Sequence, residues 1–248
     1  MSGTTRTGGR GRLGSALSGL AVAVGCVLFL GGFAWGAVLY QPYTVPTDSM
    51  TPAVTAGDRV LAERIDGADV RRGDVVVFRD AEWGDIPMIK RVVGVDGDTV
   101  ACCDAGGRLT LNGKPLEEPY LRSQGWGGKE PASPSKFSAK VPAGHLFLLG
   151  DQRMSSQDSR VHLQDATHGS VSRGAVTARV DAVVWPWRGT LERPQTFAGL
   201  PGGVSSPGPV RLVGWAVAAG AVLILGGAAY GPLTRGRGRR ATAVTGRG

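Results

Sequence analysis

The chain has 248 residues, which is enough for one ordinary domain or two small ones. Its formal net charge of +8 would suit a nucleic-acid partner, but eight of the 28 basic residues are arginines in two terminal tails that hold no acid. The other 20 basic residues are matched by 20 acidic residues, so the body of the chain is neutral. This distribution argues against nucleic-acid binding and favours contact between the tails and anionic lipid.

The first long apolar stretch covers 16–40 and contains no charged residue. At about 1.5 Å per residue it exceeds the roughly 20 residues that a helix needs to cross a bilayer. A removable signal peptide is the alternative, but the apolar core of such a peptide is usually only about 7 to 15 residues long. We therefore predict a retained transmembrane helix over 16–40, preceded by a cytoplasmic basic tail over 1–15.

The region 41–193 has the pattern of an external, mostly β domain. Alternating or short continuous apolar runs, bounded by turn signals such as Asp96-Gly97-Asp98 and Asn112-Gly113, predict antiparallel strands. By contrast, 117–139 is rich in Gly, Pro, Ser and Lys, which indicates a long loop or the tip of an inserted subdomain. The strands are expected over 58–65, 75–78, 87–95, 99–103, 108–111, 145–149 and 175–184.

A Pro/Gly/Ser-rich linker over 194–211 leads to a second uncharged apolar run, 212–233, followed by a basic tail over 234–248. Residues 200–203, Leu-Pro-Gly-Gly, resemble a cell-wall sorting signal of the Leu-Pro-x-Thr-Gly type, but the threonine is missing. We therefore predict a second transmembrane helix. Basic flanks mark the cytoplasmic side, so we expect a two-span protein of the cytoplasmic membrane with both termini cytoplasmic.

Three cysteines are present. Cys26 lies inside the first span, whereas Cys102 and Cys103 are neighbours in the external domain, where disulfides persist. A bridge between neighbours is expected to be strained, so two buried thiols are the simpler expectation, with a redox or protective bridge as the alternative. No Cys/His spacing suits zinc, and we expect neither a metal nor a cofactor.

Ser49 follows the first span, and Lys90 lies 41 residues later on a predicted strand. A serine hydroxyl needs a base to become a good nucleophile. The three histidines, His145, His162 and His168, lie at a strand end or in polar loops and are expected to have surface roles.

A lysine can serve as the base only if burial lowers its pKa from about 10.4 by some 2 to 3 units. Met88 and Val92 share a strand face with Lys90, which would supply an apolar setting for the amine. A turn serine and a lysine that reaches solvent are the alternatives for each residue alone.

Four ordered motifs resemble the conserved boxes of bacterial type I signal peptidases. Residues 46–52 read Pro-Thr-Asp-Ser-Met-Thr-Pro, 73–78 read Gly-Asp-Val-Val-Val-Phe, and 89–94 read Ile-Lys-Arg-Val-Val-Gly. Residues 150–160 read Gly-Asp-Gln-Arg-Met-Ser-Ser-Gln-Asp-Ser-Arg, similar to the family's last box, although Gln152 replaces an asparagine. The resemblance implies an antiparallel β catalytic core with an inserted β cap, here near 99–147.

The resemblance also implies a function and roles for residues. Signal peptidases of this type are membrane-bound serine endopeptidases that cut N-terminal signal peptides from exported preproteins. Ser49 would be the nucleophile and Lys90 the general base, with Thr47 and the Ser49 backbone N–H in the oxyanion hole. The remaining implied roles are orientation of the lysine and support for it, by Ser156, Asp158 and Arg160, and substrate pockets for small side chains, by Val45, Met50, Val54 and Ile89.

The sequence leaves three other functions as alternatives. A self-cleaving Ser/Lys repressor would be expected to carry a DNA-binding helical domain where the first apolar stretch lies. A sortase-like thiol enzyme would need Cys102 or Cys103 to be activated by a histidine. A membrane- or wall-tethered β binding domain without catalytic activity is the non-enzyme alternative, and it would have no need to retain Ser49, Lys90 and Ser156 together.

Overall fold

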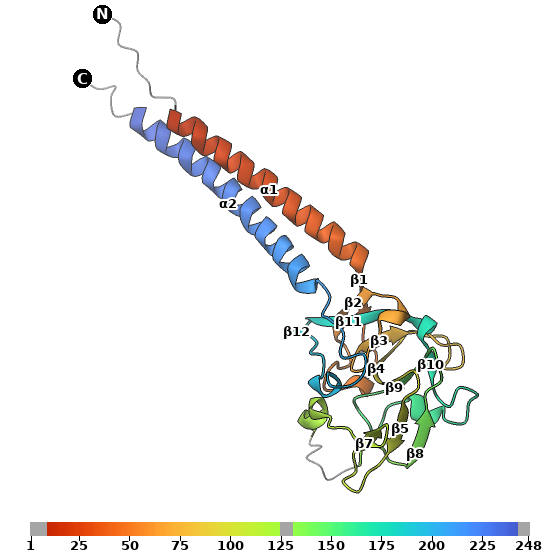
Figure 1. Cartoon of the computed structure of the whole chain (residues 1–248). Coiled ribbons are helices and arrows are strands. Elements are labelled where there is room, and N and C mark those ends of the chain that lie inside the picture. Colours follow the sequence, from red (N-terminus) through yellow and green to blue (C-terminus); the bar gives the residue numbers. More distant parts are fainter. Residues whose placement is uncertain (1–8, 125–130, 243–248) are drawn as a thin grey trace, which may run out of the picture. The chain divides into compact units, whose positions relative to one another are not determined.

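The computed structural model describes residues 9–124 and 131–242 (Figure 1). Residues 1–8 and 243–248 of the expected tails, and 125–130 of the expected loop, lie outside the described residues. The chain divides into two compact units: the two ends of the chain form a helical unit, and Leu39–Gly208 form a β unit.

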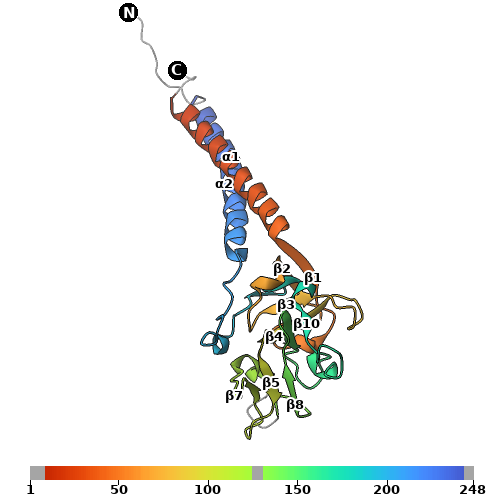
Figure 2. The same cartoon turned by 45° about the vertical axis from the view of Figure 1, so that its right-hand side comes forward.

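The helical unit contains α1 (Gly9–Leu39) and α2 (Val210–Thr242), which lie side by side in both views (Figures 1 and 2). Small residues line their contact: a Cβ atom built on Gly220 would lie 2.8 Å from the carbonyl oxygen of Gly25. The Ser18 hydroxyl also donates a hydrogen bond to the carbonyl oxygen of Gly227, at 2.7 Å. Close backbone approach of this kind is typical of helices packed within a bilayer.

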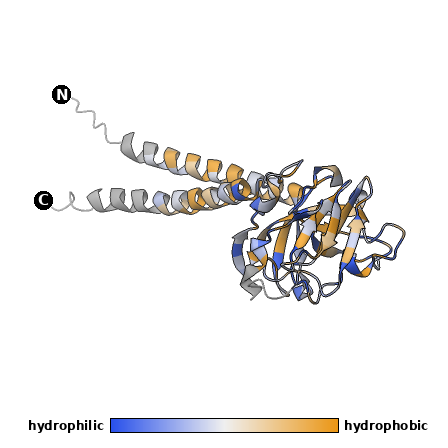
Figure 3. Cartoon of the chain, turned by 60° about the horizontal axis from the view of Figure 1, so that its bottom comes forward, coloured by the Kyte–Doolittle hydropathy of each residue, from blue (hydrophilic) through white to orange (hydrophobic). Residues whose placement is uncertain are grey.

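Both helices are long and apolar enough to cross a membrane, over Gly14–Leu39 and Val210–Tyr230. Their hydrophobic stretches are visible in Figure 3, and large apolar side chains such as Leu30 and Trp215 are exposed. Two apolar helices near the chain ends fit a two-span topology. The first helix ends one residue before the predicted boundary, because Tyr40 is already the first residue of a strand.

The β unit contains a large antiparallel sheet of eight strands. Its strand order is β1-β2-β11-β3-β4-β9-β10, and β12 pairs with β11. The strands are β1 (Tyr40–Thr44), β2 (Arg59–Arg64), β3 (Val75–Phe78), β4 (Met88–Val95), β9 (His145–Leu149), β10 (Val171–Ser172), β11 (Val176–Trp185) and β12 (Trp187–Thr190). Short 3-10 helices connect them: η1 (Asp48–Met50), η2 (Gly67–Asp69), η3 (Pro119–Gln124), η4 (Ser159–Val161), η5 (Arg173–Ala175) and η6 (Gln195–Phe197).

A second sheet is inserted between β4 and β9 and has the strand order β7-β6-β5-β8. Its strands are β5 (Thr99–Cys102), β6 (Leu109–Leu111), β7 (Lys114–Pro115) and β8 (Phe137–Lys140). The expected fold class, a mostly antiparallel β core with a β insertion and two apolar terminal helices, is therefore confirmed.

The continuous apolar run in β3 has the predicted cause. Val75 and Val77 pack into one buried cluster, whereas Val76 and Phe78 pack into another, so apolar side chains cover both faces of the strand. Similarly, Asn112 and Gly113 both have positive φ, at 54° and 76°, as a tight hairpin turn between β6 and β7 requires.

Two expectations for the inserted region are wrong. The stretch 117–139, expected to be a long loop or the tip of an inserted subdomain, does not stay irregular to its end: it runs into a strand, β8, whose pairing with β5 its short Phe-Ser-Ala-Lys sequence does not predict. Cys102 and Cys103 are joined by a disulfide instead of remaining as two thiols. Cys103 lies beyond the end of β5, so the alternation that separates neighbouring side chains on a strand does not apply to the pair.

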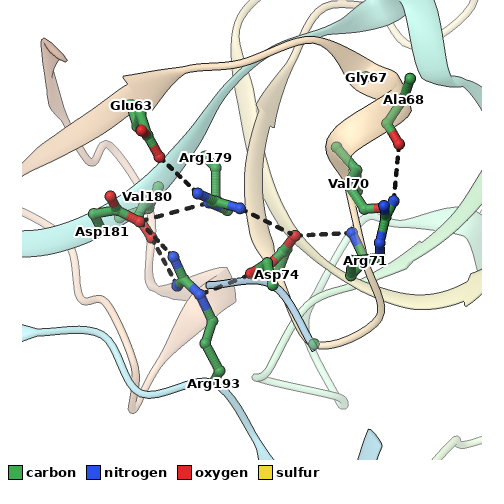
Figure 4. Close-up of polar contacts among 12 residues, drawn as sticks. Glu63, Gly67, Ala68, Val70, Arg71, Asp74, Arg179, Val180, Asp181 and Arg193 are labelled. Carbon is green, nitrogen blue, oxygen red and sulfur yellow. Dashed lines mark hydrogen bonds and ion pairs between the residues drawn. The ribbon is translucent and has the colours of Figure 1, made fainter. Parts of the chain in front are cut away.

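A buried ionic network ties together four parts of the β unit (Figure 4). Arg179 on β11 binds Glu63 on β2 at 2.6 Å and lies 3.6 Å from Asp181. Arg193 binds Asp181 and lies 3.5 Å from Asp74. Burial raises the pKa of Asp74, against the effect of the nearby arginines. Because the side chains of this ionic network are desolvated, the loss of one of them would leave a buried charge uncompensated.

The segment 194–208 packs on the β unit, although it was expected to be part of a linker over 194–211. Phe197 is fully buried, the Ser205 hydroxyl binds the Asp74 carboxylate, and Arg72 donates a hydrogen bond to the carbonyl oxygen of Pro201. These contacts come from three scattered residues of the segment, Phe197, Pro201 and Ser205, so its Pro/Gly/Ser-rich composition does not predict the attachment.

Candidate active site

The 3-10 helix η1 presents Ser49 next to a buried anchor. Met50 is buried in the core below it, and the backbone N–H of Thr51 donates to the carbonyl oxygen of Asp48 at 2.9 Å. From across the site, the backbone N–H of Gln152 donates to the carbonyl oxygen of Ser49 at 3.0 Å. The serine is thereby held on a fixed turn while its side chain stays partly accessible.

Lys90 reaches Ser49 from β4. Its Nζ lies 2.8 Å from Ser49 Oγ, although 41 residues separate the two in sequence. The β3–β4 register places Val76 opposite Lys90, and the lysine is only 3% exposed. Burial lowers the pKa of Lys90 from its ordinary 10.5 to about 8, against the opposing effects of Asp158 and Asp151.

Thr47 lies directly beside this pair. Its hydroxyl donates a hydrogen bond to Ser49 Oγ at 3.2 Å. A hydroxyl two residues before a nucleophile and within reach of it is placed to donate to an oxygen that becomes negative during attack.

Ser156 packs against Gly150, near the backbone of Ser49. Its buried Oγ has no hydrogen-bond partner among the described residues. A Cβ atom built on Gly150 would overlap Ser156 Oγ and would lie 2.6 Å from the carbonyl oxygen of Ser49. Both groups therefore converge on Gly150, where only a glycine leaves room for them.

Asp158 and Arg160 form a buried ion pair in the same loop. Arg160 donates to the two carboxylate oxygens of Asp158 at 2.8 and 2.7 Å. Asp158 also accepts a hydrogen bond from the backbone N–H of Gly150 at 2.9 Å. The pair thus fixes the loop that brings Ser156 beside Ser49.

A second buried pair lies on the other face of β4. Arg91 donates to both carboxylate oxygens of Asp151 at 2.8 and 2.7 Å. Burial alone would lower the pKa of Arg91, but the Asp151 carboxylate raises it. This contact places Arg91 away from Lys90, as the alternation of side chains along a strand predicts.

A hollow of about 310 Å³ opens next to Ser49 and Lys90. Of the four expected pocket residues, Val45, Met50 and Ile89 line it, whereas Val54 is fully buried in the core and does not. The family resemblance implied no pocket role for the other apolar residues of its wall. These are Tyr43, Pro46, Val77, Ile86, Pro87 and Met88.

None of the histidines contacts Ser49 Oγ within the described ranges. His162 stacks on Trp83 with ring centroids 4.3 Å apart and binds Asp165 at 2.8 Å. Over 9–124 and 131–242, no group of three or more His, Cys, Asp or Glu side chains could hold a metal ion. The contact that the structure describes at Ser49 Oγ from a basic side chain is the one from Lys90.

Known proteins resemble this chain in sequence. A family model described as signal peptidase, peptidase S26, matches residues 17–185. The chain is 32% identical over 199 residues to a probable signal peptidase I of Mycobacterium leprae, with 59% of this chain and 68% of the relative covered. It is 30% identical over 192 residues to signal peptidase I of Mycobacterium tuberculosis, with 59% and 65% covered. The chain therefore spans about two thirds of the length of these relatives.

A solved structure of a signal peptidase I from Enterococcus faecalis is also similar. It is 27% identical to this chain, with a TM-score of 0.36, and the match covers 50% of this chain and 97% of that one.

Proposed function

We propose that this chain, which belongs to the signal peptidase family (peptidase S26), is a membrane-bound endopeptidase that cuts N-terminal signal peptides from exported preproteins. Family membership places it among the serine peptidases, a class of hydrolases. The observation that carries the proposal is the 2.8 Å contact between Lys90 Nζ and Ser49 Oγ, in a buried setting that lowers the pKa of the amine.

In the proposed mechanism, neutral Lys90 accepts the proton of Ser49 as the serine attacks the scissile carbonyl. The resulting ammonium then protonates the leaving amine, and a water molecule hydrolyses the acyl-enzyme with Lys90 again acting as the base. With a pKa of about 8, about 10% of the amine is neutral at pH 7, compared with well under 1% at its ordinary pKa. Thr47 and the Ser49 backbone N–H would stabilise the oxyanion.

Ser156, Asp158 and Arg160 have a supporting role in this proposal. The unpartnered Ser156 hydroxyl is buried beside the site, which makes it available to hydrogen-bond the lysine amine when the proton moves. Asp158 and Arg160 hold its loop through the hydrogen bond to Gly150.

The substrate is proposed to bind in an extended conformation next to the hollow. The apolar wall of the hollow includes Val45, Met50 and Ile89, and the volume of the hollow, about 310 Å³, suits one or two small side chains. Recognition of alternate small side chains in a strand-like peptide is a known mode of β-augmentation. Val54, which is fully buried, is left out of this proposal.

The proposed topology puts both termini in the cytoplasm and the β unit outside. The basic tails over 1–15 and 234–248 support this orientation. A preprotein emerging from the membrane would then meet the site on the external side. Protease added to intact cells should cleave a tag inserted at Gly113 in the β6–β7 turn but leave a tag at either terminus intact.

The test of activity uses the full-length protein in detergent and a preprotein with a small-x-small motif. We expect cleavage after the second small residue, and a loss of at least about 10³-fold in rate for both Ser49→Ala and Lys90→Ala. Lys140→Ala, which changes an exposed lysine on β8, is the matched control and should cut normally.

Two results would contradict the proposal. Cleavage that survives Lys90→Ala but is lost with a histidine substitution would overturn the mechanism. A folded protein that binds preprotein without ever cutting it would instead support the alternative of a tethered β binding domain.

A further inference from the structure

A short stretch of the inserted region reaches back to the loop that carries Ser156. This stretch, residues 116–121, is called here the cap segment. Leu116 and Leu121 anchor it, since both are buried. Between them, Glu118 and Tyr120 face the 150–160 loop through contacts that the mechanism above does not use.

Glu118 forms a buried ion pair with Arg153 of that loop. The carboxylate binds Nη1 of Arg153 at 2.7 Å and also binds Nη2, and the two side chains are only 7% and 0% exposed. Burial alone would lower the pKa of Arg153, but the Glu118 carboxylate raises it. The arginine thus depends on this carboxylate for its charge partner, and two parallel hydrogen bonds fix the orientation of its guanidinium.

Arg153 also contacts Gly150, which lies beside Ser49 and Ser156. Its Nε donates to the carbonyl oxygen of Gly150 at 3.1 Å, while the backbone N–H of Gly150 donates to Asp158 at 2.9 Å. Gly150 is therefore held from both sides of its backbone. It is also the residue on which the Ser156 hydroxyl and the Ser49 carbonyl oxygen converge.

Tyr120 provides a second connection. Its hydroxyl donates to Glu118, and its ring lies under the guanidinium of Arg91, 4.4 Å from the ring centroid. Arg91 follows Lys90 on β4 and binds Asp151 of the same loop. The cap segment therefore contacts Arg153 within the 150–160 loop and Arg91, which binds that loop through Asp151.

We propose that Glu118 is a positioning residue for Lys90, acting through Arg153 and Gly150 to keep the 150–160 loop closed over the amine. This inference rests on the proposed function, since it deepens the role of the same site. The charged groups that act electrostatically on Lys90 are Asp158, Asp151 and Arg160, all on this loop, whereas β3 contributes the apolar Val76. A loosened loop would both admit water to the amine and move these three charges.

The direction in which the pKa of Lys90 would change follows from its burial, which has a larger effect than the nearby carboxylates. Burial lowers the pKa of Lys90 more than the two carboxylates raise it. Admitting water should therefore return the pKa towards its ordinary value, so less of the neutral base is present at pH 7.

The experiment compares Glu118→Gln with Glu117→Gln in the full-length protein in detergent. Glu117 is the matched control because it is the neighbouring residue but its side chain is 60% exposed and pairs with Arg108 at the surface. Two quantities are measured against pH: kcat/KM for preprotein cleavage, and the acetylation rate of Lys90 by acetic anhydride, read by mass spectrometry.

For Glu118→Gln we expect both pH profiles to move to higher pH by at least half a unit, which alone lowers cleavage at pH 7 about threefold. The loss should fall on kcat, with KM changed less than twofold. Glu117→Gln should match the wild type. A folded Glu118→Gln protein with wild-type profiles would overturn the inference.

If Glu118→Gln does not fold, Tyr120→Phe decides, because it removes only the hydroxyl that binds Glu118 and keeps the ring under Arg91. A smaller shift in the same direction supports the inference, and unchanged profiles overturn it. The labelling needs no peptidase activity. A shift of the Lys90 labelling profile in a protein that cuts nothing would therefore uphold the positioning role while rejecting the proposed function.

Discussion

Lys90 is a buried amine whose hydrogen bond goes to a neutral hydroxyl, not to a carboxylate. Asp158 and Asp151 favour its charged form, but burial outweighs them and lowers its pKa from 10.5 to about 8. Each unit of this shift corresponds to about 1.4 kcal/mol, so the charged lysine destabilises the folded protein by about 3 kcal/mol. In the proposed mechanism, the requirement for a reactive base at this residue opposes the requirement for stability.

Lys90→Met should therefore stabilise the β unit at pH 7, by about 1 to 3 kcal/mol, while abolishing cleavage. In the wild type the unfolded chain binds more protons than the folded one between pH 8 and 10.5, so stability should rise with pH across that window. The variant should lack this rise. Chemical unfolding in detergent, followed by tryptophan fluorescence at pH 7 and pH 10, measures both effects. A less stable variant with the same pH dependence as the wild type would contradict this account.

At the scale of elements, the two apolar helices pack through glycines at several levels. A Cβ atom built on Gly32 would lie 3.1 Å from the Cβ of Ala216, and one built on Gly227 would lie 2.8 Å from Val22. Since lipid is as apolar as the side chains, close packing and not the hydrophobic effect is what holds such a pair together.

Gly220→Leu should separate the helices, because even a Cβ atom there would lie 2.5 Å from the backbone nitrogen of Phe29. Disulfide formation between Val22→Cys and Gly227→Cys, in a Cys26→Ser background, reports their proximity. We expect the cross-linked yield in membranes to fall severalfold. Gly214→Leu is the control on the same helix, since a Cβ atom at Gly214 meets no atom within 4 Å. Equal yields in both variants would contradict this packing.

At the scale of the whole molecule, the β unit extends to Gly208, past the last strand of the sheet. Arg193 binds the buried carboxylate of Asp181 (Figure 4). Ser205 binds the buried carboxylate of Asp74, and the Tyr40 hydroxyl donates to Asp181 at 3.1 Å. The first and last segments of the β unit therefore meet at one buried ionic network, which makes the C-terminal segment part of the fold.

Arg193→Met should destabilise the β unit by about 3 kcal/mol, because it leaves buried carboxylates short of a positive partner. Arg79→Met removes an exposed arginine of the same unit and should cost no more than about 0.5 kcal/mol. Thermal unfolding of the two full-length variants, followed by tryptophan fluorescence, compares them. Equal unfolding temperatures would show that the network contributes little to stability.

Local sequence patterns are enough to predict several structural elements of this protein. Four consecutive apolar residues in β3, an Asn-Gly pair in a hairpin and two long uncharged runs each fix a structure through the conformations of neighbouring residues. The site motifs also indicated which residues to pair, since Ser49 and Lys90 stand in recognisable surroundings.

Tertiary structure decided the rest. The 2.8 Å contact between Ser49 and Lys90, the attachment of 194–208 and the pairing of Glu118 with Arg153 all join residues that are distant in sequence. Their surroundings come from several elements at once, and the desolvation that lowers the pKa of Lys90 depends on that combined burial. The sequence could therefore name the two residues on which the proposed mechanism rests, but only the packed fold sets the distance between them and their burial.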